Sequence, residues 1–232
     1  MKVYVGTSGW YYDWNKDKTL DWYISNSELD AIELNASFYR FPFPDQVKSW
    51  AKKGRSLRWV IKVNRLITHR FKFSEKANET WSRFKDLFSS MNELIDFFLF
   101  QLPPNLTSDS REKVAVFLKQ TGIVDRCALE LRHDSWFNDG MIDWARSLGL
   151  TWVSVDAPKF TRDIMRTTDT VYLRMHGRTD WYRHNYSARE LKDVTQRITS
   201  AGPERAYIFF NNDHEMLDNA RLFRNIAFSS GS

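Results

Sequence analysis

Short segments rich in β-branched and aromatic residues alternate along the chain with longer segments whose apolar residues recur every three or four positions. The expected strands are residues 3–6, 31–34, 58–62, 98–101, 127–130, 152–156, 171–176 and 206–211. Strands separated by helices pair in parallel through right-handed crossovers. Eight such units without a break in composition predict an α/β fold, a single closed (β/α)8 barrel of the TIM type, with an open doubly wound sheet as the alternative.

Glycine marks the expected ends of four helices. Each of these glycines follows an apolar stripe and precedes a strand by a few residues: Gly54, Gly122, Gly149 and Gly202. Glycine is typical of helix ends because it adopts the left-handed conformation without a steric penalty. The fourth of these helices also begins with a capping-box pair, Ser187 and Glu190. The connection after the sixth strand, residues 157–170, lacks a helical pattern, so we expect a long loop there.

The composition is that of one globular domain. The chain has 232 residues, of which 42% are hydrophobic and 27% charged, which argues against a disordered, collagenous or coiled-coil protein. Its longest unbroken apolar runs have five residues, far fewer than the roughly 20 of a membrane-spanning helix. The start of the chain lacks the apolar stretch of a signal peptide, which predicts a cytoplasmic location. The single cysteine, Cys127, excludes an intrachain disulfide and a multi-thiolate metal site. We expect residues 1–228 to form the domain and residues 229–232 a frayed tail.

Polar side chains fall at the C-terminal ends of the expected strands. Because strand side chains alternate, Glu33 and Asn35 share one face of their strand, and Ile32 and Leu34 share the other. The same reasoning places a polar group at the end of the later strands: Lys62, Gln101, Glu130 with Arg132, Ser154 with Asp156, Arg174 with His176, and Asn211. Catalytic groups of TIM barrels lie at this end of the strands, so the pattern predicts a site at the barrel mouth.

The opposite strand faces are apolar and are expected to pack against the covering helices: Leu129 with Leu131, Val153 with Val155, and Val171 with Leu173 and Met175. A buried charge costs several kcal/mol unless it is paired, so the polar groups are expected to pair with one another or with a ligand. The alternative is a network of salt bridges and hydrogen bonds that closes the barrel and binds nothing.

Several motifs resemble those of the DUF72 (YecE-like) family, in order and over nearly the whole chain. They are Gly6–Tyr11, Glu33–Arg40, Lys62 with Ile67–His69, Gln101–Pro104, Glu130–Trp136, Asp156–Pro158, Arg174–Arg178 with Trp181 and Tyr182, and Phe210–Asp213. The resemblance implies a TIM-type barrel. The family has no established activity, substrate or cofactor, so the chemistry must be inferred from the residues.

The predicted function is an enzyme that binds an anionic small molecule, with a phosphate or carboxylate group, at the C-terminal mouth of the barrel. The candidate catalytic residues are Glu33, Lys62, Glu130, His133, Asp156 and His176, which can transfer protons. The candidate substrate-binding residues are Thr7, Ser8, Trp10, Asn35, Tyr39, Gln101, Arg132, Arg174, Arg178, Trp181, Tyr182, Asn211, Asn212 and Asp213. Arginine and lysine hold the oxygens of anions. A Schiff-base role for Lys62 is a further alternative.

The sequence does not identify a cofactor, and a divalent metal is an open alternative that is not favoured. The candidate ligands of Mg²⁺, Mn²⁺ or Zn²⁺ are Glu33, Glu130, Asp156 and His176. Cations expected in the same mouth compete with a metal for these carboxylates, and no HExxH pattern is present.

The alternative function is nucleic-acid binding or processing. Basic and aromatic residues mix between Arg166 and Tyr186, and exposed rings beside cations can stack bases and hold phosphates. The net charge of +5 permits such a partner without requiring it. No membrane partner is expected, and the sequence does not indicate an oligomeric state.

Overall fold

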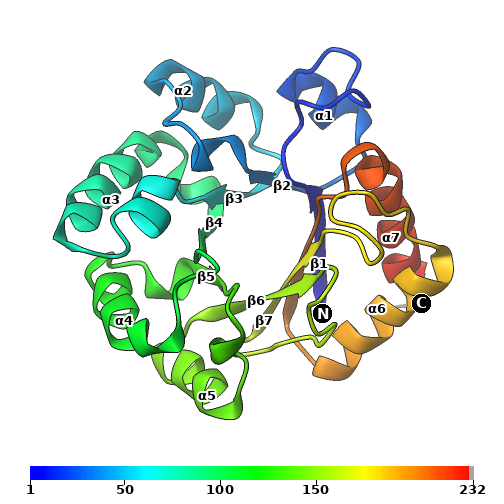
Figure 1. Ribbon diagram of the computed structural model, residues 1–232. Helices are drawn as coiled ribbons and strands as arrows, with labels where there is room; N and C mark the ends of the chain where they lie inside the picture. Colours follow the sequence, from blue (N-terminus) through cyan, green and yellow to red (C-terminus); the bar gives the residue numbers. More distant parts are fainter. Residues whose placement is uncertain (230–232) are drawn as a thin grey trace.

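Eight parallel strands close into a barrel in the computed structural model, which describes residues 1–229 (Figure 1). The strands are β1 (Lys2–Thr7), β2 (Ala31–Leu34), β3 (Arg58–Lys62), β4 (Ile95–Gln101), β5 (Cys127–Glu130), β6 (Thr151–Asp156), β7 (Thr170–Met175) and β8 (Arg205–Phe210). Each strand pairs with the next, and β8 pairs with β1 to close the sheet. The predicted TIM-type barrel is confirmed, and each expected strand overlaps an observed one.

Helices form a ring around the barrel (Figure 1). The α-helices of the described chain are α1 (Leu20–Asn26), α2 (Pro44–Lys53), α3 (Glu75–Leu87), α4 (Arg111–Gln120), α5 (Asp139–Leu148), α6 (Ala188–Ala201) and α7 (Met216–Ser229). Shorter turns lie between them: the 3-10 turns η1 (Ala36–Phe38), η3 (Ser89–Leu94), η4 (Ser108–Ser110), η5 (Val124–Arg126), η6 (Asp134–Trp136) and η7 (Asp213–Glu215), and the π-helical turn η2 (Leu66–Arg70). Residues 157–169 connect β6 to β7 without an α-helix, as predicted.

Apolar side chains from the strands fill the interior of the barrel. This cluster contains Ala31, Val60, Phe97, Leu99, Ala128, Val153, Val155, Tyr172, Tyr207 and Phe209. The ring centroids of Phe97 and Tyr207 are 5.3 Å apart, as are those of Tyr172 and Phe209. A second cluster joins the outer faces of the strands to the helices. Because the interior is packed at this level, a ligand can be held only at an end of the barrel.

Strand β6 has the opposite orientation to the one expected from its sequence. Val153 and Val155 pack inside the barrel, whereas Ser154 and Asp156 have partners in the loops outside it. Ser154 Oγ accepts a hydrogen bond of 2.8 Å from the amide of Met165. The expectation was wrong because it assumed that the polar face of each strand points inward. Both faces of β6 are buried, and loops outside the barrel supply partners for its polar side chains.

Two of the predicted helix-end glycines are required at their positions for different physical reasons. Gly149 ends α5 in the left-handed conformation, with a φ of 71°. Gly54 ends α2 with a φ of −89°, which any residue can adopt. A Cβ atom at Gly54 would lie 2.5 Å from Cζ2 of Trp59, whose indole nitrogen donates a 2.9 Å hydrogen bond to the Gly54 carbonyl. Gly54 is therefore required by the close approach of the Trp59 ring.

Replacing Gly54 by alanine is expected to lower the free energy of unfolding by about 1–3 kcal/mol, because the added methyl group overlaps the indole. Urea denaturation measures this loss. The matched background is Trp59→Phe, since a phenyl ring lacks the indole atoms nearest the methyl group. A double-mutant cycle should show Gly54→Ala costing clearly less in that background. Equal costs in both backgrounds would contradict the proposed steric cause.

The predicted capping box and the predicted C-terminal tail can also be compared with the structure. Ser187 and Glu190 form the predicted capping box at the start of α6. Helix α7 extends through Ser229, one residue into the predicted tail, and residues 230–232 of that prediction lie outside the described residues. No helix within residues 1–229 is long and apolar enough to cross a membrane.

Candidate functional site

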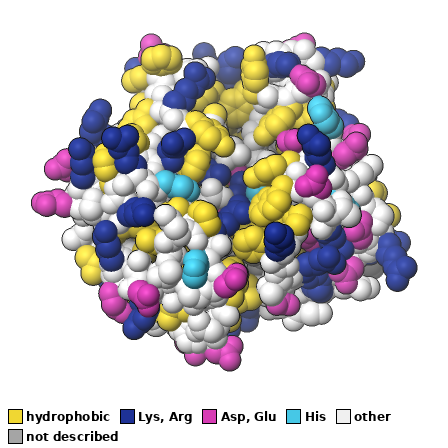
Figure 2. Space-filling model, viewed as in Figure 1, with side chains coloured by type: hydrophobic (Ala, Val, Ile, Leu, Met, Phe, Trp, Pro, Cys, Tyr) yellow, Lys and Arg dark blue, Asp and Glu magenta, His cyan; other side chains and the backbone are white. Residues whose placement is uncertain are grey.

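A cavity of about 1090 Å³ opens at the C-terminal ends of the strands. Its wall comes from the ends of β2, β3, β4 and β7, from the loops that follow β1, β2, β4, β5, β6, β7 and β8, and from α2 and η2. Figure 2 shows this face hollowed at its centre, with basic side chains inside the hollow and hydrophobic side chains around it. The cavity lies where the strand pattern predicts a site.

Arg174 lies at the floor of the cavity and is fully buried. Its guanidinium group bonds Glu33 twice, with Nε 3.0 Å from Oε2 and Nη2 2.6 Å from Oε1. Nη1 donates a third hydrogen bond of 2.5 Å to Oε2 of Glu130. Both carboxylate side chains are also fully buried. The three charges form a network across the barrel, which is what the closing-network alternative predicts.

Both carboxylate oxygens of Glu33 are hydrogen-bonded within the protein, so neither is available to accept a proton from a substrate. The hydroxyl of Tyr172 donates to its Oε2 at 2.7 Å, and Ser8 Oγ donates to its Oε1 at 2.9 Å. Together with the two bonds from Arg174, these contacts satisfy both carboxylate oxygens. Glu33 therefore holds Arg174 in place, and a role as general base would require breaking this set.

Both carboxylate oxygens of Glu130 are likewise bonded to neighbouring side chains. Gln101 Nε2 donates to its Oε1 at 2.7 Å, and the guanidinium of Arg132 forms an ion pair with the same oxygen. Burial alone would raise the pKa of Glu130, but the charges of Arg132 and Arg174 outweigh it and hold the pKa well below its ordinary value. Glu130 stays ionised and bonded. Arg132 in turn stacks against the ring of Trp181, with 4.9 Å between its Cζ atom and the ring centroid.

Lys62 is the buried cation without an anionic partner. Its side chain comes from the last residue of β3, is 5% exposed and lines the cavity. Nζ lies 4.4 Å from the centre of the Phe38 ring and has no hydrogen bond or ion pair within residues 1–229. Burial, followed by the charge of Arg174, lowers the pKa of Lys62 from its ordinary 10.5 to about 7. The amine is therefore close to half protonated at neutral pH.

His176 adds an unsatisfied donor. Asn211 Nδ2 lies 3.2 Å from its Nδ1, and an amide nitrogen can only donate, so the ring proton of the neutral imidazole is on Nε2. Nε2 is buried and has no partner in the described chain. Burial, followed by the charge of Arg174, holds the pKa of His176 well below its ordinary value. The site therefore contains a neutral N–H group that lacks an acceptor.

His69 is a cavity residue that the strand pattern does not indicate. It lies in η2, and its ring meets that of Phe38 edge to face with 5.1 Å between centroids. Burial, followed by the charge of Lys62, lowers the pKa of His69 to about 4. Its appearance in a family motif beside Lys62 was the available sequence signal.

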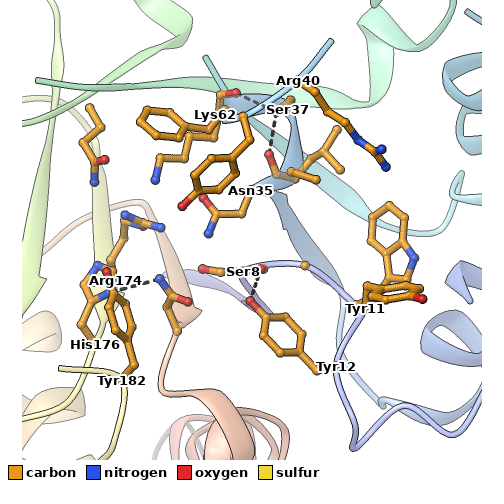
Figure 3. Close-up of a pocket in the computed structure, with 18 of the residues that line it drawn as sticks. Ser8, Tyr11, Tyr12, Asn35, Ser37, Arg40, Lys62, Arg174, His176 and Tyr182 are labelled. Carbon is orange, nitrogen blue, oxygen red and sulfur yellow. Dashed lines mark hydrogen bonds between the residues drawn. The ribbon is translucent and has the colours of Figure 1, made fainter. Parts of the chain in front are cut away.

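Aromatic rings form the outer wall of the cavity. Tyr11 and Tyr39 are 74% and 68% exposed at its rim, and Trp10 lies deeper against Trp50 with ring centroids 5.6 Å apart. Tyr12 was also missed by the sequence reasoning; its hydroxyl donates to the Ser8 carbonyl at 3.1 Å. In Figure 3, Tyr11 lies on the far side of the cavity from Arg174 and His176. Tyr182 lies next to His176 in the same view, so aromatic rings line both sides of the cavity and the buried cations lie on one of them.

The structure brings most of the candidate residues to the cavity wall: Ser8, Trp10, Asn35, Tyr39, Lys62, Gln101, Arg132, Arg174, His176, Trp181, Tyr182, Asn211 and Asp213. The candidates that do not line it are Thr7, Glu33, Glu130, His133, Asp156, Arg178 and Asn212. Glu33 and Glu130 lie beneath it, in the network described above.

The other five bond to neighbouring loops and helices. Asp156 binds the guanidinium of Arg178, with Nη2 2.9 Å from Oδ2, on the outer side of β6. Thr7 Oγ1 donates to the Gly9 carbonyl at 2.8 Å, and the His133 side chain caps η6. Asn212 Nδ2 donates to the carbonyl of His184 at 2.7 Å. These residues hold the loops that shape the mouth.

The four candidate metal ligands are not gathered around one point. Asp156 is on the outer side of β6, and both carboxylates in the network are bonded to Arg174. Within residues 1–229 no group of three or more His, Cys, Asp or Glu side chains is arranged to hold a metal ion.

A closed (β/α)8 barrel with buried charges at its C-terminal mouth defines a TIM-barrel protein with a ligand-sized cavity in the position typical of barrel active sites. Within that class, the chain belongs to the family described as "Protein of unknown function DUF72", whose family model matches residues 4–228. The resemblance of the motifs is thereby confirmed.

Solved structures agree with this assignment. A DUF72 family protein from Thermotoga maritima MSB8 is 25% identical, with a TM-score of 0.82 over 97% of this chain and 99% of that one. A DUF72 family protein from Enterococcus faecalis V583 is 21% identical, with a TM-score of 0.82 over 97% of each chain. A D-tagatose 3-epimerase-like protein shares only the fold, with 12% identity and a TM-score of 0.51. No functionally curated protein matches the chain.

Proposed function

We propose that this protein is an enzyme that binds a small molecule carrying one carboxylate or phosphate group at the barrel mouth and uses Lys62 as its acid and base. The observation that supports this most directly is Lys62 Nζ, which is buried in the cavity wall without an anionic partner. A buried cation in such a position is expected to be neutralised by a ligand.

The charge balance of the floor favours a ligand with a small negative charge. Among residues 1–229, the buried carboxylates that act on Lys62 are Glu33 and Glu130, and Arg174 and Arg132 already bond them. One further anionic group balances the protonated Lys62. The unpaired Nε2–H of His176 can donate to the same group.

Lys62 also has the properties of a proton-transfer group. General acid and base catalysis is most efficient when the pKa of the catalytic group is near the working pH, and the pKa of Lys62 is about 7. An anion bound beside Lys62 favours its protonated form, so ligand affinity should fall as pH rises above 7. His176 remains neutral and acts as a hydrogen-bond donor in this scheme.

The nucleic-acid alternative has less support from the same segment. Tyr172, Arg174 and Tyr186 are buried and cannot stack or hold an exposed strand. Trp181 and Tyr182 line the cavity instead. These buried and cavity-lining groups are better placed for a small ligand than for an extended polymer, whereas Arg166 and Arg183 of the same segment are exposed.

A panel of carboxylates and phosphates tests the proposal by thermal unfolding. At least one compound at a hundred times its Kd should add about 2.7 kcal/mol of stability and raise the Tm by about 5–10 °C. Lys62→Met should abolish the shift, whereas Lys113→Met, which removes an exposed lysine on α4, should retain it. A single-stranded oligonucleotide is included as the competing ligand class. The proposal fails if no anion stabilises the protein or if Lys62→Met responds like the wild type.

A further inference from the structure

Lys62 differs from every other lysine of the described chain. It is the one lysine that is buried within residues 1–229. Its amine lies in the wall of a large cavity, so a small molecule can reach it. Its lack of a hydrogen-bonded carboxylate leaves the nitrogen lone pair free whenever the amine is neutral.

We propose that Lys62 forms a Schiff base with the carbonyl group of an anionic substrate of the 2-oxo acid class. This inference rests on the anion site of the proposed function, and it makes the Lys62 amine a nucleophile rather than an acid and base. The anionic group of the substrate would be held by Arg132 and the Nε2–H of His176, and its carbonyl carbon would face Nζ.

The surroundings of Nζ favour the neutral amine that such a reaction needs. On one side lie the Phe38 ring, 4.4 Å from Nζ, and the neutral His69 imidazole packed against that ring. The charged and titratable groups that act on Lys62 are Arg174 from β7, Glu130 from β5, Glu33 from β2 and Arg132 beyond β5. Burial is the largest cause of the lowered pKa, and the charge of Arg174 is the next.

The anion-binding groups of the cavity lie near the amine. Figure 3 shows Arg174 and His176 on one side of the cavity, with the Lys62 amine directed toward them. His176 and Lys62 are close enough for the charge of one to lower the pKa of the other. A substrate with its carboxylate next to its carbonyl group fits this arrangement, because the two groups are joined by a single bond.

The proposed step needs no oxidant, reductant or co-reactant. The lone pair of Nζ forms a bond to the carbonyl carbon, the C=O π pair moves to oxygen, and a proton passes from nitrogen to that oxygen. The resulting carbinolamine expels hydroxide as the nitrogen lone pair forms the C=N bond. Solvent protonates the hydroxide, so the products are a protonated Schiff base and one water molecule. The buried carboxylates of Glu33 and Glu130 stabilise its positive charge.

Reductive trapping tests the inference. The wild-type protein is incubated with pyruvate, glyoxylate or the neutral ketone acetone in the presence of cyanoborohydride, and the products are read by intact mass and peptide mapping. We expect one adduct per chain on Lys62 with an oxo acid, at least about tenfold faster than on any surface lysine. Acetone should react more slowly, because it lacks the anionic group.

Variants and pH provide the controls. Lys62→Met and Lys62→Arg should lose the adduct, and Lys113→Met should keep it. At oxo-acid concentrations far below saturation, the trapping rate should rise with pH around a midpoint near 7, the pKa of Lys62 in the unliganded protein. Modification spread evenly over surface lysines would overturn the inference.

The two proposals fail in different ways. If oxo acids or other anions stabilise the protein through Lys62 but no adduct forms, the Schiff base is wrong and the anion site remains. If no anion stabilises the protein and no adduct forms on Lys62, both are wrong. A Lys62 adduct with an oxo acid supports the inference.

Discussion

Replacing Arg174 by methionine is expected to lower the free energy of unfolding by about 3–5 kcal/mol, because Glu33 and Glu130 would be left buried without their shared cation. Both carboxylates are fully buried, and Arg174 supplies three of their hydrogen bonds. Urea denaturation followed by circular dichroism measures the loss as a shift in the transition midpoint. Arg146→Met, which removes an exposed pair with Asp143 on α5, is the matched control and should cost less than about 1 kcal/mol.

A triple variant tests whether the stability lost by Arg174→Met comes from leaving the two carboxylates unpaired or from losing the arginine side chain itself. Replacing Arg174, Glu33 and Glu130 together by methionine removes the charges along with their cation. Buried ion networks replaced by apolar residues of similar volume are often as stable as the original. The triple variant should therefore recover most of the stability lost by Arg174→Met. If Arg174→Met loses less than about 1 kcal/mol, the network does not stabilise the barrel as argued.

The stability of the wild type relative to Lys62→Met should rise by about 1.4 kcal/mol per pH unit between about pH 7 and pH 10.5. In that range the unfolded chain holds the Lys62 proton and the folded protein does not, so raising the pH favours the folded state. Below pH 7 the proton is bound in both states, and the full destabilisation of about 5 kcal/mol applies. Above pH 10.5 the proton is absent from both states, and the difference becomes constant.

Denaturant midpoints of the two proteins at a series of pH values measure this effect. The comparison with Lys62→Met cancels the other titrating groups, such as the tyrosines. Lys113→Met, measured in the same way, should follow the wild type at every pH because its amine is exposed. A difference between wild type and Lys62→Met that does not change across this range would show that Lys62 keeps an ordinary pKa. The Lys62 amine would then be almost fully protonated at neutral pH, which contradicts the Schiff-base inference.

The expected and observed sites differ in ways that depend on long-range contacts. Alternation within β2, β5 and β7 placed Glu33, Glu130 and Arg174 on the inner face, and the structure brings them into one network. The same reasoning failed for β6, whose polar residues Ser154 and Asp156 have loop partners outside the barrel. All four strands are buried on both faces, so alternation separates two faces without showing which one is inside; β6 differs because loops provide partners for its polar face.

The sequence also did not show which of the buried charges would be paired. Glu33 and Arg174 are 141 positions apart, so only closure of the barrel makes them partners. The same closure leaves Lys62 without a carboxylate although two lie nearby, because Arg174 and Arg132 already bond them. The sequence alone proposed Glu33 and Glu130 as catalytic together with Lys62 and His176, and only the contacts separate the bonded carboxylates from the two groups without partners.

The sequence by itself determined the barrel, its family and the end of the barrel at which the polar groups gather. These properties follow from helix and strand periodicity and from the alternation of side chains along a strand, which are local and covalently fixed. Tertiary structure alone decided which charges are satisfied and which are not. Hydrogen-bond partners and burial depend on distances between segments remote in the chain, and in this protein those distances leave Lys62 Nζ and His176 Nε2 without partners among residues 1–229.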